Sequence, residues 1–396
     1  MRQELLKPVV LQLIDSFNQG GSERQALQLT RLLSESGNFK VRLASLSPEG
    51  SLRSEIQHLG LGEVPSFPLN SFYDANAVIQ LRRFVQWLKS SHINILHTHD
   101  FYTNVFGMAG GSIARLPVRI ASMRETAGMR STAQKSVQRV AYSLAHQIVA
   151  NSNAVRDTLI AEGTSPDKVT VVYNGLDVRR LMQTPISRAD GLKLLDLDVA
   201  ESRRFVSIVA NMRHEVKDYP MFLRAARQVA DEVPEAAFLL AGEGELMESL
   251  RTLTNDLGIQ DATHFLGRCD RIAELLSISE ICVLSSKAEG FSNSILEYMA
   301  AGRPVVVTNV GGAGELVTEN DTGYLVPSGD HEMMAARIVE LMRDPARARM
   351  MGDKGQRVVK QRFSCEAQLM RTESLYRSLL EPARRGSNFS QDAISK

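Results

Sequence analysis

Short apolar runs alternate with stretches of helical spacing along most of this chain, and this alternation restricts the fold more than any other feature. The run 9–14 is apolar like a buried strand, and a loop with Gly20 and Gly21 follows it. Helical spacing then begins at Ser22, the expected N-cap, with Gln25 as its capping-box partner. A strand, a glycine turn and a helix in this order open a doubly wound sheet, so the sequence predicts an α/β fold.

The alternation occurs in two halves, and each half predicts a parallel sheet with helices on both faces. The predicted strands are 9–14, 41–46, 93–97, 118–122, 147–151, 169–173, 205–210, 236–240, 263–266, 281–284, 304–308 and 323–326. The predicted helices include 77–88, 103–114, 131–146, 219–232, 246–257, 294–301 and 333–342.

The division between the halves follows from length and periodicity. A chain of 396 residues suits two domains of ordinary size. The stretch 176–204 is polar and has no clear period, so we predict a linker there. We therefore expect one domain over 1–175, a second over 176–364, and a flexible tail over 381–396.

Composition excludes several classes of protein. The 46 basic and 45 acidic residues leave a net charge of +1, which argues against nucleic-acid binding through excess positive charge. Cys269, Cys282 and Cys365 form no CxxC pair, so we expect neither a structural zinc site nor a redox motif. No apolar run is long enough for a transmembrane helix, and the run ending at Ile14 is too short for a signal peptide. We predict a cytoplasmic protein, with a peripheral position on the inner face of the membrane as an alternative.

The most informative motif is built around two glutamates. Glu289 lies in a loop after a predicted strand, and Gly290 lets the backbone approach a ligand closely. Ser292 or Asn293 can cap the next helix, whose first amides form an anion site for a phosphate. Glu297 lies about one turn into that helix, where it can meet the hydroxyls of a ribose. For an isolated glutamate pair two solvated acids are the commoner interpretation, but the flanking strand and turn favour a nucleotide-sugar site.

Arg213 and Lys217 follow the first strand of the second half, at an edge where open α/β sheets bind ligands. They can clamp a diphosphate and stabilise its charge as it leaves, and two solvated loop cations are an equally good interpretation. Gly20 and Gly21 do not form the GxGxxG fingerprint. They are either a simple tight turn or a place where the backbone approaches a ligand.

His97 and His99 project to the same face of a predicted strand because successive strand residues alternate. We expect His97 to be a packed or hydrogen-bonded core residue. His99 lies nearer the end of the strand and is the better candidate to face a cleft. A zinc pair is the weaker interpretation, because no third ligand is visible.

In this order and spacing, these residues resemble the retaining glycosyltransferases of the GT-B fold, in glycosyltransferase family 4 (group 1). The resemblance covers about residues 8–380. The strongest match runs from Glu289 to Glu297, which follows the E-x7-E motif of the family. The other matching segments are Gly20–Glu23, His97–His99, Asn151–Asn153, Asn174–Gly175, Arg213 with Lys217, Gly242–Gly244, Phe265–Gly267, Gly311–Gly312 and Gly323–Val326.

The resemblance implies two Rossmann-like domains that face a cleft, with the acceptor bound by 1–175 and the nucleotide sugar by 176–364. A final helix at about 365–380 is expected to pack back on the first domain. The implied reaction is hexosyl transfer with retention of configuration and without a cofactor or metal ion. The donor is a nucleotide sugar, with a UDP-sugar favoured. The acceptor is a glycan or lipid-linked molecule of cell-surface polysaccharide or glycolipid synthesis.

The resemblance also assigns roles to single residues. Glu289 contacts the donor sugar and Glu297 the ribose, while the leaving phosphate itself helps to deprotonate the acceptor. The implied catalytic residues are His99, Arg213, Lys217 and Glu289. The implied donor-binding residues are Gly20, Gly21, Arg213, Lys217, Glu289, Gly290, Phe291, Ser292 and Glu297. Asp218 departs from the pattern, because many relatives have glycine after the lysine, and we expect it to point away from the phosphates as a helix cap.

Two other functions stay open at this stage. One is another enzyme on the same fold, such as a sugar-nucleotide epimerase, and the other is a non-catalytic module that binds a nucleotide sugar. Intact motif residues favour the transferase over both. The segment 112–140 has six basic residues and one acidic residue, a local charge of +5. It predicts contact with an anionic membrane surface, or equally a solvated helix face.

Overall fold

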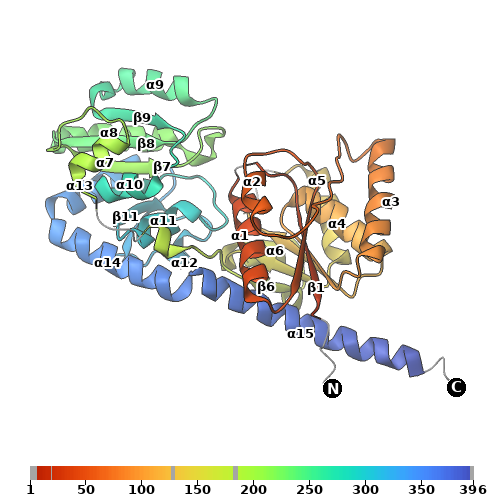
Figure 1. Ribbon diagram of the computed structural model, residues 1–396. Coiled ribbons are helices and arrows are strands. Elements are labelled where there is room, and N and C mark those ends of the chain that lie inside the picture. Colours follow the sequence, from red (N-terminus) through yellow and green to blue (C-terminus); the bar gives the residue numbers. More distant parts are fainter. Residues whose placement is uncertain (1–6, 19, 126–129, 182–185, 393–396) are drawn as a thin grey trace. The chain divides into compact units, whose positions relative to one another are not determined.

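The computed structural model shows two compact units, each with one six-stranded sheet. The first unit is Met1–Gly175 with Cys365–Lys396, and the second is Leu176–Ser364. The strands of both sheets pair in parallel, and helices flank both sheets, which confirms the predicted α/β class (Figure 1). The described residues are 7–18, 20–125, 130–181 and 186–392, with side chains omitted for 180 and from 383 onward.

The sheet of the first unit runs in the order β2-β1-β3-β4-β5-β6, so the order reverses between β1 and β3. The strands are β1 (Val9–Ile14), β2 (Lys40–Ser45), β3 (Ile95–Thr98), β4 (Val118–Met123), β5 (Gln147–Ala150) and β6 (Val169–Val171). The helices are α1 (Gly21–Ser36), α2 (Arg53–Gln57), α3 (Ala75–Ser90), α4 (Phe101–Ile113), α5 (Thr132–Leu144), α6 (Asn153–Ala161) and α15 (Cys365–Asp392). In open α/β sheets, ligands bind outside the carboxyl ends of the strands at such a reversal.

The two faces of this sheet have separate cores because neighbouring strand residues point to opposite sides. Leu11 packs in a cluster with side chains of α3, α4 and α5, whereas Val10 packs in a cluster with α1 and α15. Helix α15 contributes the buried side chains of Leu375, Tyr376 and Leu380 to the second cluster. Burial of each such side chain is worth about 1.5–3 kcal/mol, so the C-terminal helix is an integral part of the first unit.

The sheet of the second unit runs in the order β12-β11-β10-β7-β8-β9 and reverses between β10 and β7. The strands are β7 (Arg204–Val209), β8 (Ala236–Ala241), β9 (Thr263–Gly267), β10 (Ser279–Leu284), β11 (Val305–Thr308) and β12 (Gly323–Val326). The helices are α7 (Arg188–Leu194), α8 (Tyr219–Glu232), α9 (Met247–Asp256), α10 (Ile272–Ile278), α11 (Asn293–Ala300), α12 (Ala313–Leu316), α13 (His331–Arg343) and α14 (Pro345–Arg362).

The start of α1 differs from the prediction. The helix begins at Gly21, and its N-cap is Gly20 rather than Ser22. The Glu23 carboxylate folds back over Gly20, where a Cβ would lie 2.0 Å from Glu23 Oε2. Gln25, expected to complete a capping box, instead donates from Nε2 to a backbone carbonyl oxygen at the end of the unit, 3.1 Å away. A side chain at Gly20 would therefore displace the Glu23 carboxylate from the helix start.

Two segments predicted as irregular contain helix. The linker expected over 176–204 includes α7, whose Leu192 is buried against Phe205 in the core of the second unit. Seven residues are too few to show a helical period, and 182–185 lie outside the described residues. The tail expected over 381–396 is helical as far as Asp392, because extending a helix costs far less than starting one, and 393–396 lie outside the described residues.

Candidate functional site

Three polar side chains meet at the carboxyl edge of the second sheet, where its strand order reverses. Lys217 Nζ lies 2.6 Å from Glu289 Oε1, and the Ser286 hydroxyl donates to the same oxygen at 2.7 Å. The lysine ends a short turn after β7, and the other two follow β10. The side chains of Lys217 and Glu289 are 19% and 11% exposed. The structure thus brings together two of the predicted residues and adds Ser286, for which the sequence offered no signal beyond its position after a strand.

Backbone contacts hold the loops of this cluster together. The Ser285 hydroxyl donates to the Lys217 carbonyl at 2.8 Å, and the Lys287 amide donates to the Val216 carbonyl at 2.8 Å. Asp218 has a left-handed backbone, with φ of 43°, and its carboxylate caps α8, as predicted. A left-handed position favours glycine and tolerates aspartate, so Asp218 retains the turn that presents Lys217.

Gly311 supports Glu289 from the loop after β11. Its φ is 53°, and a Cβ there would lie 1.8 Å from the Glu289 carbonyl oxygen. The Gly312 amide donates to the Gly290 carbonyl at 3.0 Å. Only glycine at position 311 allows the two loops to approach this closely.

Helix α11 begins directly after the cluster. Ser292 is its N-cap and accepts from the Ile295 amide. The Ser294 hydroxyl donates to the Val209 carbonyl at 2.8 Å and ties the helix start to the end of β7. Phe291 is buried against Phe363 with ring centroids 5.4 Å apart, so its side chain is a packing residue. A ligand at this helix start would contact the backbone of Phe291.

Arg213 and Glu297 lie in the same unit but have other neighbours. Arg213 is 55% exposed, and its Nη2 lies 3.8 Å from Glu243 Oε1. The loop of Glu243 is held against the loop of Arg213 because the Met212 amide donates to the Glu243 carbonyl at 2.9 Å. Glu297 is half-buried in the second turn of α11.

The predicted residue His99 lies at the carboxyl edge of the first sheet but is buried. Its Nε2 is 2.6 Å from Gln12 Oε1, and its Nδ1 is 3.2 Å from Arg124 Nη2. His97 is also buried and contacts Ser122 and Tyr376, which confirms the prediction of a hydrogen-bonded core histidine. Burial and the Arg124 charge lower the pKa of His97 to about 3, and burial lowers that of His99 well below its usual value.

Three carboxylates lie at this edge, and two of them, Glu23 and Asp100, interact with Arg124. Asp15 follows β1, Asp100 follows β3 and caps α4, and Glu23 is in the first turn of α1. Burial raises the pKa of Asp100 to about 7, with Asp15 and Glu23 adding to the shift. Burial also raises the pKa of Asp15 and of Glu23, and it lowers that of Arg124 to about 10. Sequence reasoning named none of these four as a site residue, although two directly follow strands at the reversal.

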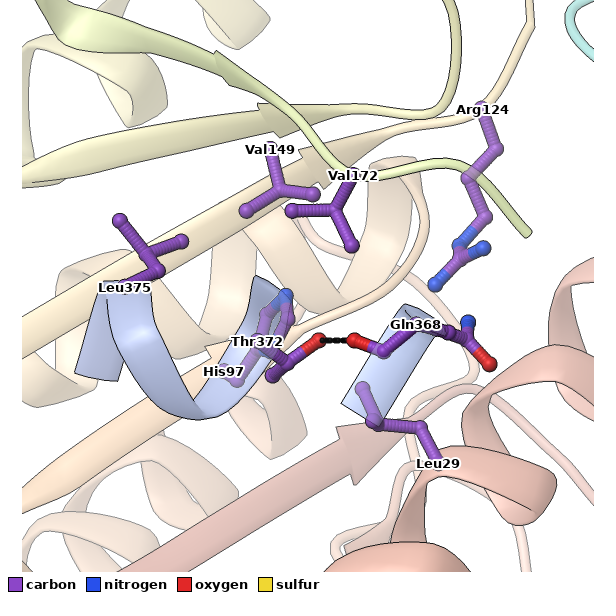
Figure 2. Close-up of a pocket in the computed structure, with 8 residues that line it drawn as sticks. All are labelled: Leu29, His97, Arg124, Val149, Val172, Gln368, Thr372 and Leu375. Carbon is purple, nitrogen blue, oxygen red and sulfur yellow. Dashed lines mark hydrogen bonds between the residues drawn. The ribbon is translucent and has the colours of Figure 1, made fainter. Parts of the chain in front are cut away.

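One cavity in the described part of the first unit is too small for a sugar. Its volume is about 10 Å³, which accommodates about one water molecule, whereas ligand sites are many times larger. Figure 2 shows the side chains around it, with Thr372 donating to Gln368. The lining residues are Leu29, His97, Arg124, Val149, Val172, Gln368, Thr372 and Leu375.

Two features are absent from the part of the chain that the structure describes. It holds no cluster of three histidine, cysteine or acidic side chains able to bind a metal ion. Across the same residues, no helix is both long and apolar enough to cross a membrane.

Comparison with known proteins gives two family matches, one in each half. The description "Glycosyltransferase Family 4" matches residues 19–180, and "Glycosyl transferases group 1" matches 196–358. The chain is 32% identical over 237 residues to N-acetyl-alpha-D-glucosaminyl L-malate synthase of Bacillus anthracis, which is 59% of this chain and 61% of that relative. It is also 26% identical to an Escherichia coli enzyme named UDP-Gal:alpha-D-GlcNAc-diphosphoundecaprenol alpha-1,3-galactosyltransferase. This match extends over 283 residues and covers 68% of this chain and 71% of that relative.

Solved structures agree on the fold. Anabaena Alr3699/HepE in complex with UDP superposes with a TM-score of 0.82 at 21% identity, over 93% of this chain and 99% of that one. The two halves therefore match the two family models, and the solved structure shares their two-sheet architecture. The chain belongs to the glycosyltransferases of family 4, group 1, with the GT-B fold.

Proposed function

We propose that this protein transfers a hexose from a UDP-sugar to a hydroxyl of a glycan or lipid-linked acceptor, with retention of configuration and without a metal ion. The observation that carries the proposal is the contact of Lys217, Glu289 and Ser286 at the reversal point of the second sheet. This edge is the one at which such sheets bind nucleotides. Support for UDP comes from Alr3699/HepE, solved in complex with UDP and with UDP-glucose.

In this proposal the second unit binds the donor. The amides at the start of α11 and the cations of Lys217 and Arg213 neutralise the diphosphate, which lowers the cost of its departure. Glu289 accepts hydrogen bonds from hydroxyls of the donor sugar, and Glu297 accepts them from the ribose. Lys217 is positioned by Glu289 before the donor arrives, so little reorganisation is needed when it turns to a phosphate.

We also propose that Gly20 and Gly21 contact the donor, and the position of Glu23 sets one condition for this contact. The Glu23 carboxylate lies over Gly20 and carries negative charge when ionised. A phosphate beside Gly20 therefore requires Glu23 to be protonated or turned away. The raised pKa of Glu23, caused mainly by burial, makes protonation easier.

For the acceptor, we propose a neutral, polyhydroxylated group bound by the first unit. Its sheet edge carries Asp15, Glu23 and Asp100, together with the guanidinium of Arg124. Carboxylates accept hydrogen bonds from sugar hydroxyls, and this charge balance disfavours an anionic group. A glycan fits these requirements, and the E. coli relative is named for a GlcNAc-diphosphoundecaprenol acceptor.

The membrane contact proposed for 112–140 rests on fewer charges than the sequence count implies. Arg119 donates to backbone carbonyls, and Lys135 lies 3.3 Å from Glu162. Arg124 and Arg130 also have local partners, and 126–129 lie outside the described residues. Arg115 and Arg139 are the exposed cations left to meet anionic lipid, near the exposed apolar residues Ile113, Val137 and Val140. A cytoplasmic location also stays a prediction.

The proposal is tested by incubating the full chain with UDP-glucose, UDP-galactose, UDP-N-acetylglucosamine and GDP-mannose, each with undecaprenyl-diphosphate-linked sugars as acceptor. We expect release of UDP from one UDP-sugar, accelerated by the acceptor and unaffected by EDTA. Proton NMR of the product is expected to show the anomeric configuration of the donor. No release of nucleoside diphosphate from any donor, with UDP binding also absent by calorimetry, would contradict the proposal.

A further inference from the structure

A continuous chain of hydrogen bonds crosses the interior of the first unit. It joins side chains from β1, β3, β4, the loop after β4, and α15. In order, its members are Arg124, His99, Gln12, Tyr376, His97 and Ser122. The successive contacts are 3.2, 2.6, 3.0, 2.7 and 2.8 Å long. All members except Arg124 are buried.

The donors and acceptors of this hydrogen-bond chain favour one direction, which starts from Arg124 because an arginine can only donate. An arginine has no acceptor, so Arg124 Nη2 must donate to His99 Nδ1. Because neutral His99 then carries its proton on Nε2, it donates to Gln12 Oε1. The Gln12 amide nitrogen donates to the Tyr376 oxygen, and the Tyr376 hydroxyl donates to His97 Nδ1.

The last step fixes His97 as well. With Nδ1 accepting from Tyr376, neutral His97 carries its proton on Nε2 and donates to Ser122 Oγ. The centroids of the two imidazole rings are 4.5 Å apart, so protonating both would place two buried cations side by side. This direction of donation predicts two neutral histidines, each as the Nε2–H tautomer.

One end of this hydrogen-bond chain is the Arg124 guanidinium, which is only partly buried. Arg124 Nη1 donates to Asn174 Oδ1 at 2.8 Å, and its Nη2 is held by His99. These two contacts orient the guanidinium at the carboxyl edge of the sheet, where it interacts with Glu23 and Asp100. The opposite part of the hydrogen-bond chain depends on Tyr376, which comes from the C-terminal helix.

We propose that Tyr376 is a positioning residue that orients Arg124 for acceptor binding, acting through Gln12 and His99. The inference rests on the proposed transferase function. Without the Tyr376 hydroxyl, the Gln12 amide is free to turn its nitrogen toward His99. His99 must then accept at Nε2 and carry its proton on Nδ1, facing the guanidinium. Two donors would then oppose each other, and Arg124 would leave its position.

The tautomers can be measured directly on the unmodified protein. In ¹⁵N-histidine NMR of the full chain, with signals assigned through single His→Gln variants, we expect His97 and His99 to be neutral Nε2–H tautomers. In Tyr376→Phe, we expect His99 to shift to the Nδ1–H form. A wild-type His99 that is protonated, or that carries its proton on Nδ1, overturns the proposal whatever the variants do.

Kinetics then separate positioning from loss of packing. We expect Tyr376→Phe to lower kcat for acceptor-dependent UDP release about tenfold, with KM for the UDP-sugar unchanged. Thr372→Val is the matched control, because Thr372 is buried one turn earlier on α15 and its hydroxyl donates within the helix at 2.9 Å. It should keep kcat within twofold. An equal loss in both variants, or an unchanged kcat in Tyr376→Phe, overturns the positioning role.

The two proposals fail in different ways. If no nucleotide sugar is turned over, the proposed function is wrong, while the NMR result still decides the direction of the hydrogen-bond chain. If transfer occurs but His99 has the other tautomer, the positioning role is wrong and the transferase proposal stands.

Discussion

The two units have the same architecture but opposite chemistry at corresponding places. Each sheet reverses its strand order once, between β1 and β3 in the first unit and between β7 and β10 in the second. At the second reversal a lysine, a serine and a glutamate contact one another. At the first, Asp15 and Asp100 follow the strands, and the nearby cation, Arg124, is held by a buried histidine.

This difference shows how one fold serves two kinds of ligand. The Lys217 ammonium is ion-paired with Glu289 and is placed where it can turn to a phosphate. Burial raises the pKa of Asp100 to about 7 and also raises those of Asp15 and Glu23, and such carboxyl groups suit neutral hydroxyl groups. The sheet supplies the place, and the residues that follow the strands supply the chemistry.

We expect the largest effect at the proposed donor site of the second unit, and its absence would contradict the difference between the two units. We expect Lys217→Met to lower transfer by about 100-fold, because the leaving diphosphate loses its main buried cation. Glu289→Gln should cause a similar loss through the donor sugar. The measurement is acceptor-dependent UDP release.

Lys287→Met is the matched control for Lys217→Met. Lys287 lies in the neighbouring loop, is 52% exposed, and has its Nζ 3.9 Å from Asp218 Oδ1. Its activity should stay within about twofold, since exposed pairs contribute little. Equal losses at both lysines would show that general charge, rather than the ion-paired edge, binds the donor.

The next prediction compares two glycines of the second unit, Gly311 and Gly267. In Gly311→Ala the new Cβ meets the Glu289 carbonyl oxygen, so we expect Glu289 to shift and turnover to fall about tenfold. Gly267 has a similar φ of 61° but nothing within 4 Å of its Cβ position. Gly267→Ala should cost only roughly 1–2 kcal/mol of stability and leave turnover unchanged. Equal turnover in the two variants would mean that Gly311 does not support the site.

The acceptor side predicts a pH effect on stability. The pKa of Asp100 is about 7 in the folded state, against an ordinary value of 3.8. Between those values the folded state binds a proton that the unfolded state releases, so the ionisation costs stability as pH rises, and the cost is complete above pH 7. Asp100→Asn keeps an oxygen for the α4 cap but cannot ionise.

We therefore expect the Tm of Asp100→Asn to exceed that of the wild type by a few degrees at pH 8, and the difference to shrink toward pH 5. Thermal unfolding followed by circular dichroism at several pH values measures it. A difference that does not depend on pH would show that the pKa of Asp100 is not raised in the folded state.

The smallest expected effect concerns the membrane. Arg139→Gln should weaken binding to vesicles with anionic lipid about fivefold at low salt, since one cation near such a surface is worth about 1 kcal/mol. Arg268→Gln, an exposed arginine of the second unit, is the control and should bind like the wild type. Absence of vesicle binding by the wild-type protein at low salt would remove the membrane proposal.

Local patterns accounted for most strands but for fewer of the helices. The strand 9–14 and the helix that became α8 were predicted from periodicity alone. Helix α14 was not predicted, because its 18 residues include many charges and few apolar side chains at a helical spacing. Helix α10, with seven residues, was too short to show a period.

For the candidate site, spacing identified Lys217 and Glu289 separately, 72 residues apart, and only the fold places them 2.6 Å from each other. Gln12 and Tyr376 carry no motif and are 364 residues apart, and their contact exists because α15 packs on the first sheet. His99 was predicted to face a reacting centre, and the structure instead places both of its nitrogens in contacts with Gln12 and Arg124.

By itself the sequence determined the α/β class, the two halves and the family, because periodicity, turn glycines and motif order are local properties of the chain. The tertiary structure decided which of the predicted residues meet, and which charges of 112–140 are used within the fold. It also buried the two histidines among hydrogen-bond partners, and this burial lowers their pKa values. These properties depend on burial and on donors and acceptors distant in sequence, and neither exists until the sheets and α15 have packed.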